Sequence, residues 1–263
     1  MLAEEGRISV AGAVLEYKLI GAPPSRSPTI VMLHEGLGSV STWGEFPQRL
    51  FEQTGASVFV YSRPGYGASP PTEPGLSVDY ITRHARDVLP QILETIGFSR
   101  GLLLGHSDGA SIAVAYAGNF QDARVHGLVL IAPHFCVEPE TLAEIRRARK
   151  AFEIGDLRQR LSRHHKYVDA AFFGWNDVWL NPEFAAFNLR EELGRISIPM
   201  LIIRGDGERY GTYRQVQMAQ DICKGPLEIV SVPDCGHLPH REKPAQTVEA
   251  IARFSSRVIR GPT

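Results

Sequence analysis

Short apolar runs alternate with helix-like segments along most of this chain, and no other feature of the sequence constrains its fold as strongly. The runs carry few charges, which fits strands buried on both faces of a parallel sheet. Two alternating stretches at the start, joined by a turn at Gly12, predict an opening hairpin. The predicted strands are Arg7–Val10, Val14–Ile20, Thr29–Leu33, Ser57–Tyr61, Gly101–Leu104, Gly127–Ile131, Met200–Ile203 and Leu227–Val232.

Segments with apolar residues at helical spacing fill the intervals between these runs. They are Trp43–Gln53, Val78–Ile96, Asp108–Asn119, Tyr213–Ile222 and Pro244–Val258. Strands that alternate with helices form parallel sheets, because each crossover helix packs back onto the sheet. The sequence therefore predicts an α/β fold, a mostly parallel eight-stranded sheet flanked by helices.

The stretch 136–196 interrupts this alternation, since it contains no clear strand pattern. It is charged over Glu138–Arg160 and then rich in aromatic residues. A structureless loop of that length is unusual in a compact domain. We therefore expect a helical cap inserted after the sixth strand of the sheet, and a core formed by residues 1–135 and 197–263.

The composition argues against several classes of protein. Lys and Arg number 28 against 29 Asp and Glu, a formal net charge of −1, so the chain lacks the basic character of a nucleic-acid binder. Its three cysteines are widely spaced, which argues against a disulfide framework. The start resembles no signal peptide, and no apolar run approaches the ~18 residues of a membrane-spanning helix. We expect a cytoplasmic protein without nucleic-acid or membrane partners.

A candidate nucleophile follows the Gly101–Leu104 run. The sequence Gly105-His106-Ser107-Asp108-Gly109 matches the G-x-S-x-G pattern, and a helix rich in small residues leaves it. An apolar strand, a sharp turn and a helix are the context of a nucleophile elbow, which thrusts the serine hydroxyl outward. A serine that merely caps the helix is the alternative.

A serine hydroxyl needs a base to accept its proton. His237 is the best candidate, because it lies in a turn between the last strand and the last helix; His240 is its neighbour and competitor. Together with Cys235 these two histidines could suggest a metal site, but they offer only three ligands and no second cluster. We predict no metal.

The base in turn needs a carboxylate to fix its tautomer and stabilise the imidazolium. Asp206 and Glu208 follow the Met200–Ile203 strand, so the chain order serine, acid, histidine matches a known triad order. Either carboxylate fits this order. An acid from elsewhere, such as Glu138 after the preceding strand, is a further alternative.

These motifs together resemble the α/β-hydrolase superfamily, in particular its capped branch with a serine nucleophile, and the resemblance covers nearly the whole chain. In that branch the acid usually lies three residues after the glycine that ends its strand, which from Gly205 gives Glu208. The loop His34-Glu35-Gly36-Leu37-Gly38 resembles the family's His-Gly-x-x-Gly loop, with Glu35 at the first glycine position. The resemblance implies an oxyanion hole formed by the backbone amides of Gly36 and Asp108. Glu35 is expected to point away from it, towards Arg63.

The resemblance implies a serine hydrolase that needs no cofactor and cleaves carboxylic esters of small or apolar substrates with water, and the near-zero net charge fits a neutral substrate. Serine at the elbow, where dehalogenases and epoxide hydrolases of the family carry aspartate, argues against those activities. A lactonase, thioesterase, aminopeptidase or carbon–carbon-bond hydrolase uses the same triad, and a non-catalytic protein that binds small ligands is the alternative from another class. The expected pocket residues are His34, Glu35, His106, Phe172, Trp175 and Trp179.

Overall fold

A computed structural model describes residues 3–72 and 75–259. Its strands form one eight-stranded sheet in the order β1-β2-β4-β3-β5-β6-β7-β8. Strand β2 runs antiparallel to both of its neighbours. The other six strands, β4, β3, β5, β6, β7 and β8 in sheet order, pair in parallel. The strands are β1 Glu5–Val10, β2 Ala13–Ile20, β3 Thr29–Leu33, β4 Ser57–Tyr61, β5 Gly101–His106, β6 Val125–Ile131, β7 Met200–Gly205 and β8 Leu227–Val232. The predicted fold class is confirmed.

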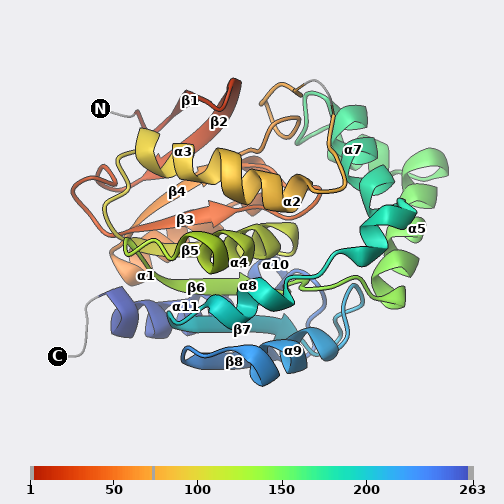
Figure 1. The fold of residues 1–263 in the computed structure, drawn as a ribbon. Helices are drawn as coiled ribbons and strands as arrows, with labels where there is room; N and C mark the ends of the chain where they lie inside the picture. The colour runs from red at the N-terminus through yellow and green to blue at the C-terminus, as the bar shows by residue number, and fades with distance from the viewer. Residues whose placement is uncertain (1–2, 73–74, 260–263) are drawn as a thin grey trace.

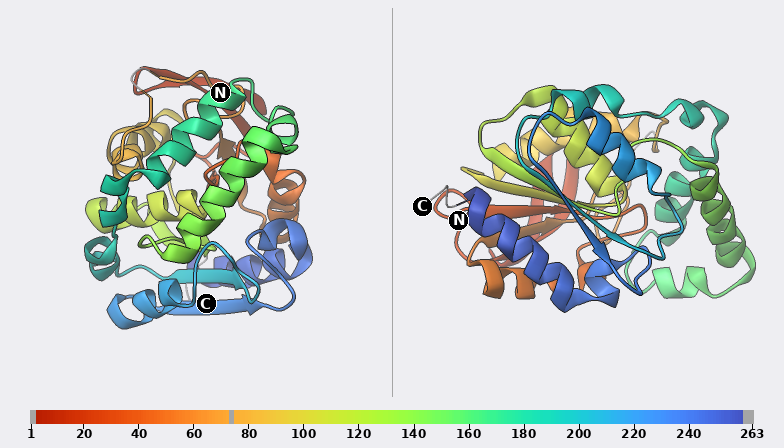
Figure 2. Two further views of the ribbon diagram at one scale, coloured as in Figure 1. Left: turned by 90° about the vertical axis from the view of Figure 1, so that its right-hand side faces the viewer. Right: turned by 90° about the horizontal axis from the view of Figure 1, so that it is seen from below.

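Helices cover both faces of this sheet (Figures 1 and 2). They are η1 Ser41–Trp43, α1 Phe46–Thr54, α2 Tyr80–Arg83, η2 His84–Val88, α3 Leu89–Thr95, α4 Asp108–Phe120, α5 Pro139–Ile154, α6 Leu157–Leu161, α7 Val168–Leu180, η3 Pro182–Ala186, α8 Arg190–Arg195, α9 Arg214–Ile222, α10 Pro239–Glu242 and α11 Pro244–Ile259. Alternate residues of each buried strand pack against the helix layers on the two faces of the sheet. In β3, Ile30 and Met32 pack with α1 and α11, whereas Val31 and Leu33 pack with the opposite layer of helices.

Two predicted helices differ from the observed ones for local reasons. The segment Trp43–Gln53 is broken at Gly44, whose φ of 57° and ψ of −129° end the short η1 before α1 begins. The segment Val78–Ile96 is helical but winds through the π-helical turn η2, where the Leu89 amide donates to the His84 carbonyl. Pro90 follows directly, and because proline has no amide hydrogen it cannot continue the regular α-helical pattern there.

The insertion after β6 is helical, as predicted, and lies at the carboxyl ends of the parallel strands (Figure 1). Helices α5 and α7 run side by side across that end of the molecule (Figure 2, left). The rings of Phe152 and Phe172 stack between them with centroids 3.8 Å apart. The last helix of the stretch, α8, packs against α4 and α9 over the sheet itself, so the part that extends beyond the sheet is α5 through η3.

The helices in residues 3–72 and 75–259 also bear on membrane topology. None of them is both long enough and apolar enough to cross a bilayer.

Candidate active site

Ser107 lies at the tight turn between β5 and α4. Its φ of 52° and ψ of −116° are strained for a residue with a Cβ atom, as at many functional sites. The flanking glycines permit the turn: a Cβ on Gly105 would lie 2.3 Å from the Gly109 carbonyl oxygen, and one on Gly109 would lie 2.0 Å from the Leu33 carbonyl oxygen. Both distances are prohibitive, so glycine is required at both positions for this serine to protrude.

His237 lies in the loop between β8 and α10, and its Nδ1 atom is 2.7 Å from Oε2 of Glu208. The Glu208 side chain is 4% exposed, and its other oxygen accepts a hydrogen bond of 2.7 Å from the Tyr210 amide. Burial alone would raise the pKa of the Glu208 carboxyl. The charge and hydrogen bond of His237, together with the Tyr210 amide, outweigh burial and lower this pKa to about 2. Glu208 is therefore an ionised partner of His237 near neutral pH.

The other two candidate acids do not contact His237. Asp206 is exposed, and its Oδ1 atom accepts a hydrogen bond of 3.4 Å from the Cys235 amide. Glu138 is buried and accepts hydrogen bonds from Thr212 and Gln215. The structure thus brings Glu208 alone of the three into contact with the histidine.

The hydrogen bond from His237 to Glu208 fixes the tautomer of the ring. An ionised carboxylate only accepts, so the proton of a neutral His237 lies on Nδ1 and the lone pair is on Nε2. Ser107 and His237 line the same cavity, although no hydrogen bond joins Ser107 Oγ to the ring in the described part of the chain. In ligand-free sites such bonds are commonly long and tighten when substrate binds.

The backbone amides of Gly36 and Asp108 have no hydrogen-bond acceptor within residues 3–72 and 75–259. Both residues line the cavity with the serine. A Cβ on Gly36 would lie 2.1 Å from Nε1 of Trp175, so α7 rests directly on this loop. Unpaired amides next to a nucleophile can stabilise negative charge on a substrate oxygen.

The Asp108 carboxylate is held in the interior. The Tyr80 hydroxyl donates to it, a guanidinium nitrogen of Arg63 lies 3.9 Å from its Oδ2 atom, and the side chain is 1% exposed. The Tyr80 hydroxyl also accepts a hydrogen bond of 3.0 Å from Trp179. Burial raises the pKa of Asp108, and the Arg63 charge opposes that rise. These contacts anchor the first residue of α4, whose backbone amide lacks an acceptor among the described residues.

The expected pairing of the Glu35 carboxylate with Arg63 is wrong. Arg63 donates instead to the backbone carbonyls of His34 and Glu35, at 2.5 and 3.0 Å. These two hydrogen bonds use both terminal nitrogens of its guanidinium group. The Glu35 carboxylate lies 3.3 Å from Nδ1 of His106, whose Nε2 atom is 2.9 Å from the His237 carbonyl oxygen. Both ring nitrogens of His106 therefore face oxygen atoms, one of a carboxylate and one of a backbone carbonyl. Glu35 is thereby linked through His106 to the loop that presents His237.

The cavity over Ser107 has a volume of about 400 Å³. Of the predicted pocket residues, Glu35, Trp175 and Trp179 line it. His34, His106 and Phe172 are fully buried and lie outside the lining. The sequence reasoning missed His134, Tyr210 and three arginines, Arg160, Arg163 and Arg241, all of which line the cavity. Tyr210 could have been found, because it lies two residues after Glu208.

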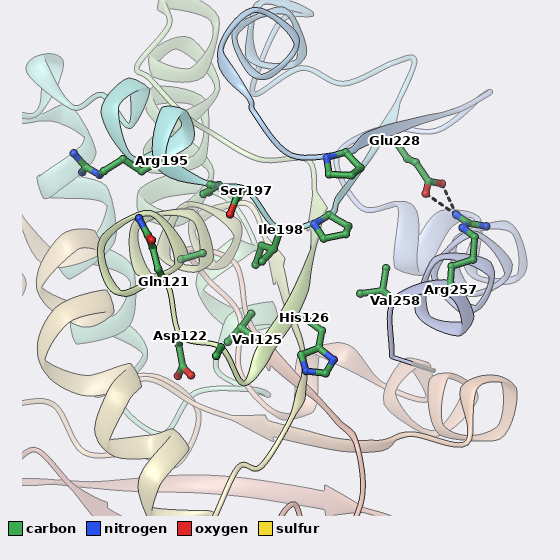
Figure 3. A pocket seen from close by; sticks show the side chains of 15 residues that line it. Gln121, Asp122, Val125, His126, Arg195, Ser197, Ile198, Glu228, Arg257 and Val258 are labelled. Atoms are coloured by element: carbon green, nitrogen blue, oxygen red, sulfur yellow. Dashed lines mark hydrogen bonds and ion pairs between the residues drawn. The ribbon is translucent and has the colours of Figure 1, made fainter. Parts of the chain in front are cut away.

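A second cavity, of about 620 Å³, lies at the opposite edge of the sheet, where β6, β7 and β8 begin (Figure 3). Arg257 and Glu228 pair with each other at 2.6 Å, and Arg195 and Asp122 pair with residues outside the cavity. Ser197 and His126 line it, but no hydrogen bond joins them among the described residues. This cavity therefore lacks the paired histidine and carboxylate of the first one.

Within the described ranges, no three or more His, Cys, Asp or Glu side chains form a group that could hold a metal ion.

Known proteins resemble this chain over most of its length. A proline iminopeptidase from Lactobacillus crispatus is 22% identical, and the match covers 95% of this chain and 97% of that protein. An esterase from Rhodococcus is 20% identical with a TM-score of 0.73, covering 97% of this chain and all of its own. The enol-lactonase from Burkholderia xenovorans is 21% identical with a TM-score of 0.72, covering 95% and 99%. These two structures share the fold. A family model described as alpha/beta hydrolase family matches residues 30–250, and the chain belongs to that family.

Proposed function

We propose that this protein is a serine hydrolase that cleaves carboxylic esters through an acyl-enzyme, with Ser107 as nucleophile, His237 as base and Glu208 as the triad acid. The observation that carries the proposal is the hydrogen bond of 2.7 Å between His237 and the buried Glu208, at the cavity that Ser107 also lines. A histidine held in this tautomer can accept the serine proton. Lactones are cyclic esters and follow the same steps.

In the proposed reaction, Ser107 Oγ forms a bond to the substrate carbonyl carbon while its proton passes to Nε2 of His237. The carbonyl oxygen becomes an oxyanion, which the amides of Gly36 and Asp108 stabilise. The carbon–oxygen bond to the alcohol then breaks, and the alcohol leaves with the proton from His237. Water attacks the acyl group with His237 again as base, which releases the carboxylic acid and restores the serine.

Charge in the cavity favours an ester over a substrate with a free amino terminus, which an iminopeptidase would bind. A protonated amine needs an unengaged carboxylate, but the carboxylates that line the cavity, Glu35 and Asp108, already face His106 and Tyr80. Arginines line the same cavity and would repel a cationic amine. We therefore place ester hydrolysis first and peptide hydrolysis second.

Hydrolysis of p-nitrophenyl esters from acetate to octanoate, with proline p-nitroanilide alongside, tests this function. Ester turnover by the wild type should fall by at least about 10³-fold in Ser107→Ala. Ser256→Ala, on the exposed side of α11, is the matched control and should retain full activity. Cleavage of the anilide without esters would indicate an iminopeptidase. Turnover of neither class, including lactones and a vinylogous diketone, would indicate the non-catalytic alternative.

A further inference from the structure

The cavity over Ser107 has a positively charged side that the proposed reaction does not use. Arg160 and Arg163 come from α6 and the turn after it, and Arg241 comes from α10, four residues beyond His237. His164 lies with them. Two chain segments far apart in the sequence thus direct cationic side chains at one cavity. We refer to Arg160, Arg163 and Arg241 as the arginine rim.

No carboxylate of the cavity neutralises the arginine rim. The Glu35 carboxylate faces His106 at 3.3 Å, and Asp108 accepts from Tyr80 in the interior with only 1% of its side chain exposed. Within residues 3–72 and 75–259, Arg160 is the one rim member with a counter-charge, because its Nε atom lies 3.3 Å from Asp156. Both carboxylates that line the cavity, Glu35 and Asp108, therefore interact with residues other than the arginine rim.

Arg163 and Arg241 have no ion-pair partner and no side-chain hydrogen bond in the part of the chain that the structure describes. Arg158, on the same short helix as Arg160, is paired instead, with contacts of 2.9 and 2.7 Å to Asp169. The two unpaired cations act on a common neighbour, since burial and the charges of Arg241 and Arg163 together lower the pKa of His164. The rim is thus a local excess of positive charge beside a catalytic cavity.

We propose that the arginine rim binds a carboxylate of the substrate, so that the enzyme prefers esters or lactones whose acyl or alcohol part ends in a free carboxylate. This inference rests on the proposed ester hydrolysis. A guanidinium forms paired, charge-assisted hydrogen bonds with a planar carboxylate, and a partly enclosed cavity screens them less than bulk water does.

The walls between the rim and the serine match a short apolar spacer. Leu157 and Leu161 line the cavity from the same helix as Arg160, and Leu238 lines it beside His237. A volume of about 400 Å³ is at the small end of ligand pockets. A chain of a few methylene groups therefore links the reacting carbonyl to the terminal carboxylate. The proposed substrate is thus an anion, in contrast to the neutral substrate expected from the net charge.

The kinetic test compares two p-nitrophenyl esters of similar length, the monoester of adipic acid and the hexanoate, with the buffer-only rates subtracted. The wild type should have a kcat/KM about tenfold or more higher for the adipate ester than for the hexanoate. This ratio is the effect expected of one charge-assisted hydrogen bond. Arg163→Gln and Arg241→Gln should each lower that ratio at least fivefold. High salt should also lower the ratio, because it screens the charges. Arg158→Gln, which removes a charge from the same helix outside the cavity, should leave the ratio unchanged.

A binding test gives a result even if neither ester is hydrolysed. Adipate is titrated into Ser107→Ala protein and the fluorescence of Trp175 and Trp179, which line the cavity, is followed. Adipate should bind at least tenfold more tightly than hexanamide, and Arg163→Gln should abolish the difference. Inorganic phosphate is included, and equal competition by phosphate would show a general anion site and overturn the assignment to a carboxylate.

The two proposals fail in different ways. Equal turnover of both esters, with no adipate preference in binding, would overturn the arginine rim and leave ester hydrolysis standing. Adipate binding that depends on Arg163 without hydrolysis of any ester would support the rim and overturn the proposed function.

Discussion

Replacing Glu208 with glutamine tests the assignment of the triad acid most directly. The substitution keeps the shape of the side chain and removes its charge, while the hydrogen-bonding position 2.7 Å from His237 stays occupied. Folding lowers the pKa of Glu208 from 4.5 to about 2, and about 2.5 pKa units correspond to roughly 3 kcal/mol of net interaction with its surroundings. The side chain is 4% exposed, so solvent screens little of that interaction.

That free energy predicts the size of the kinetic effect. If most of it stabilises the imidazolium formed when His237 accepts the serine proton, glutamine should lower kcat/KM by about 10²-fold from the lost charge alone. An amide group also permits the wrong ring tautomer, which raises the expected loss towards about 10⁴-fold. The assay is the initial rate of p-nitrophenyl ester hydrolysis, with thermal unfolding as a check on folding.

Asp206→Asn is the matched control, because Asp206 is exposed and, among the described residues, its side chain has one hydrogen bond, of 3.4 Å from the Cys235 amide. It should change kcat/KM less than about threefold, as expected of an exposed side chain outside the triad. A larger loss from Asp206→Asn than from Glu208→Gln would refute the assignment. A Glu208→Gln enzyme with more than a tenth of wild-type activity would refute the reasoning from charge.

Three further outcomes are expected. Gly109→Ala would place a Cβ 2.0 Å from a backbone carbonyl oxygen at the end of β3, so urea unfolding should show a loss of about 2 kcal/mol or more, whereas Gly75→Ala, with open space around it, should stay near neutral. Tyr80→Phe removes the hydroxyl that donates to the buried Asp108 carboxylate and should cost about 1.5–3 kcal/mol in the same measurement. Because the folded pKa of Glu208 is depressed, the stability advantage of the wild type over Glu208→Gln should be full above pH 4.5 and disappear as the pH falls towards about 2; an advantage that persists at pH 2 would contradict this.

The parts of the site that depend on local sequence could be predicted. The turn at Ser107 needs glycines at fixed offsets, and the clashes that a Cβ would cause at Gly105 and Gly109 show why this signal is strong. Glu208 and His237 follow neighbouring parallel strands, β7 and β8, whose carboxyl ends lie at one edge of the sheet. Spacing and topology were therefore enough to predict that these two loops lie together.

Features that depend on how the insertion folds over the sheet could not be predicted. Arg163 and Arg241 carry no signal of their own in the sequence, because a charged residue on a short helix usually faces solvent. They meet only because α6 and α10 border the same cavity. Phe172 shows the opposite error: its aromatic ring was expected in the pocket, but it stacks on Phe152 between two helices of the insertion.

One contact between insertion and core couples the proposed oxyanion hole to the wall of the cavity. Trp175 of α7 fills the space that a side chain at position 36 would need, so the loop that offers one oxyanion amide and the wall of the cavity form a single packed unit. The proposed acid and base, by contrast, lie on loops of the sheet, and the Glu208–His237 hydrogen bond needs no atom of the insertion. We therefore expect a change at Arg163, which lies on the insertion, to alter substrate preference without moving the acid and base, and a change at Trp175 to alter preference and oxyanion binding together.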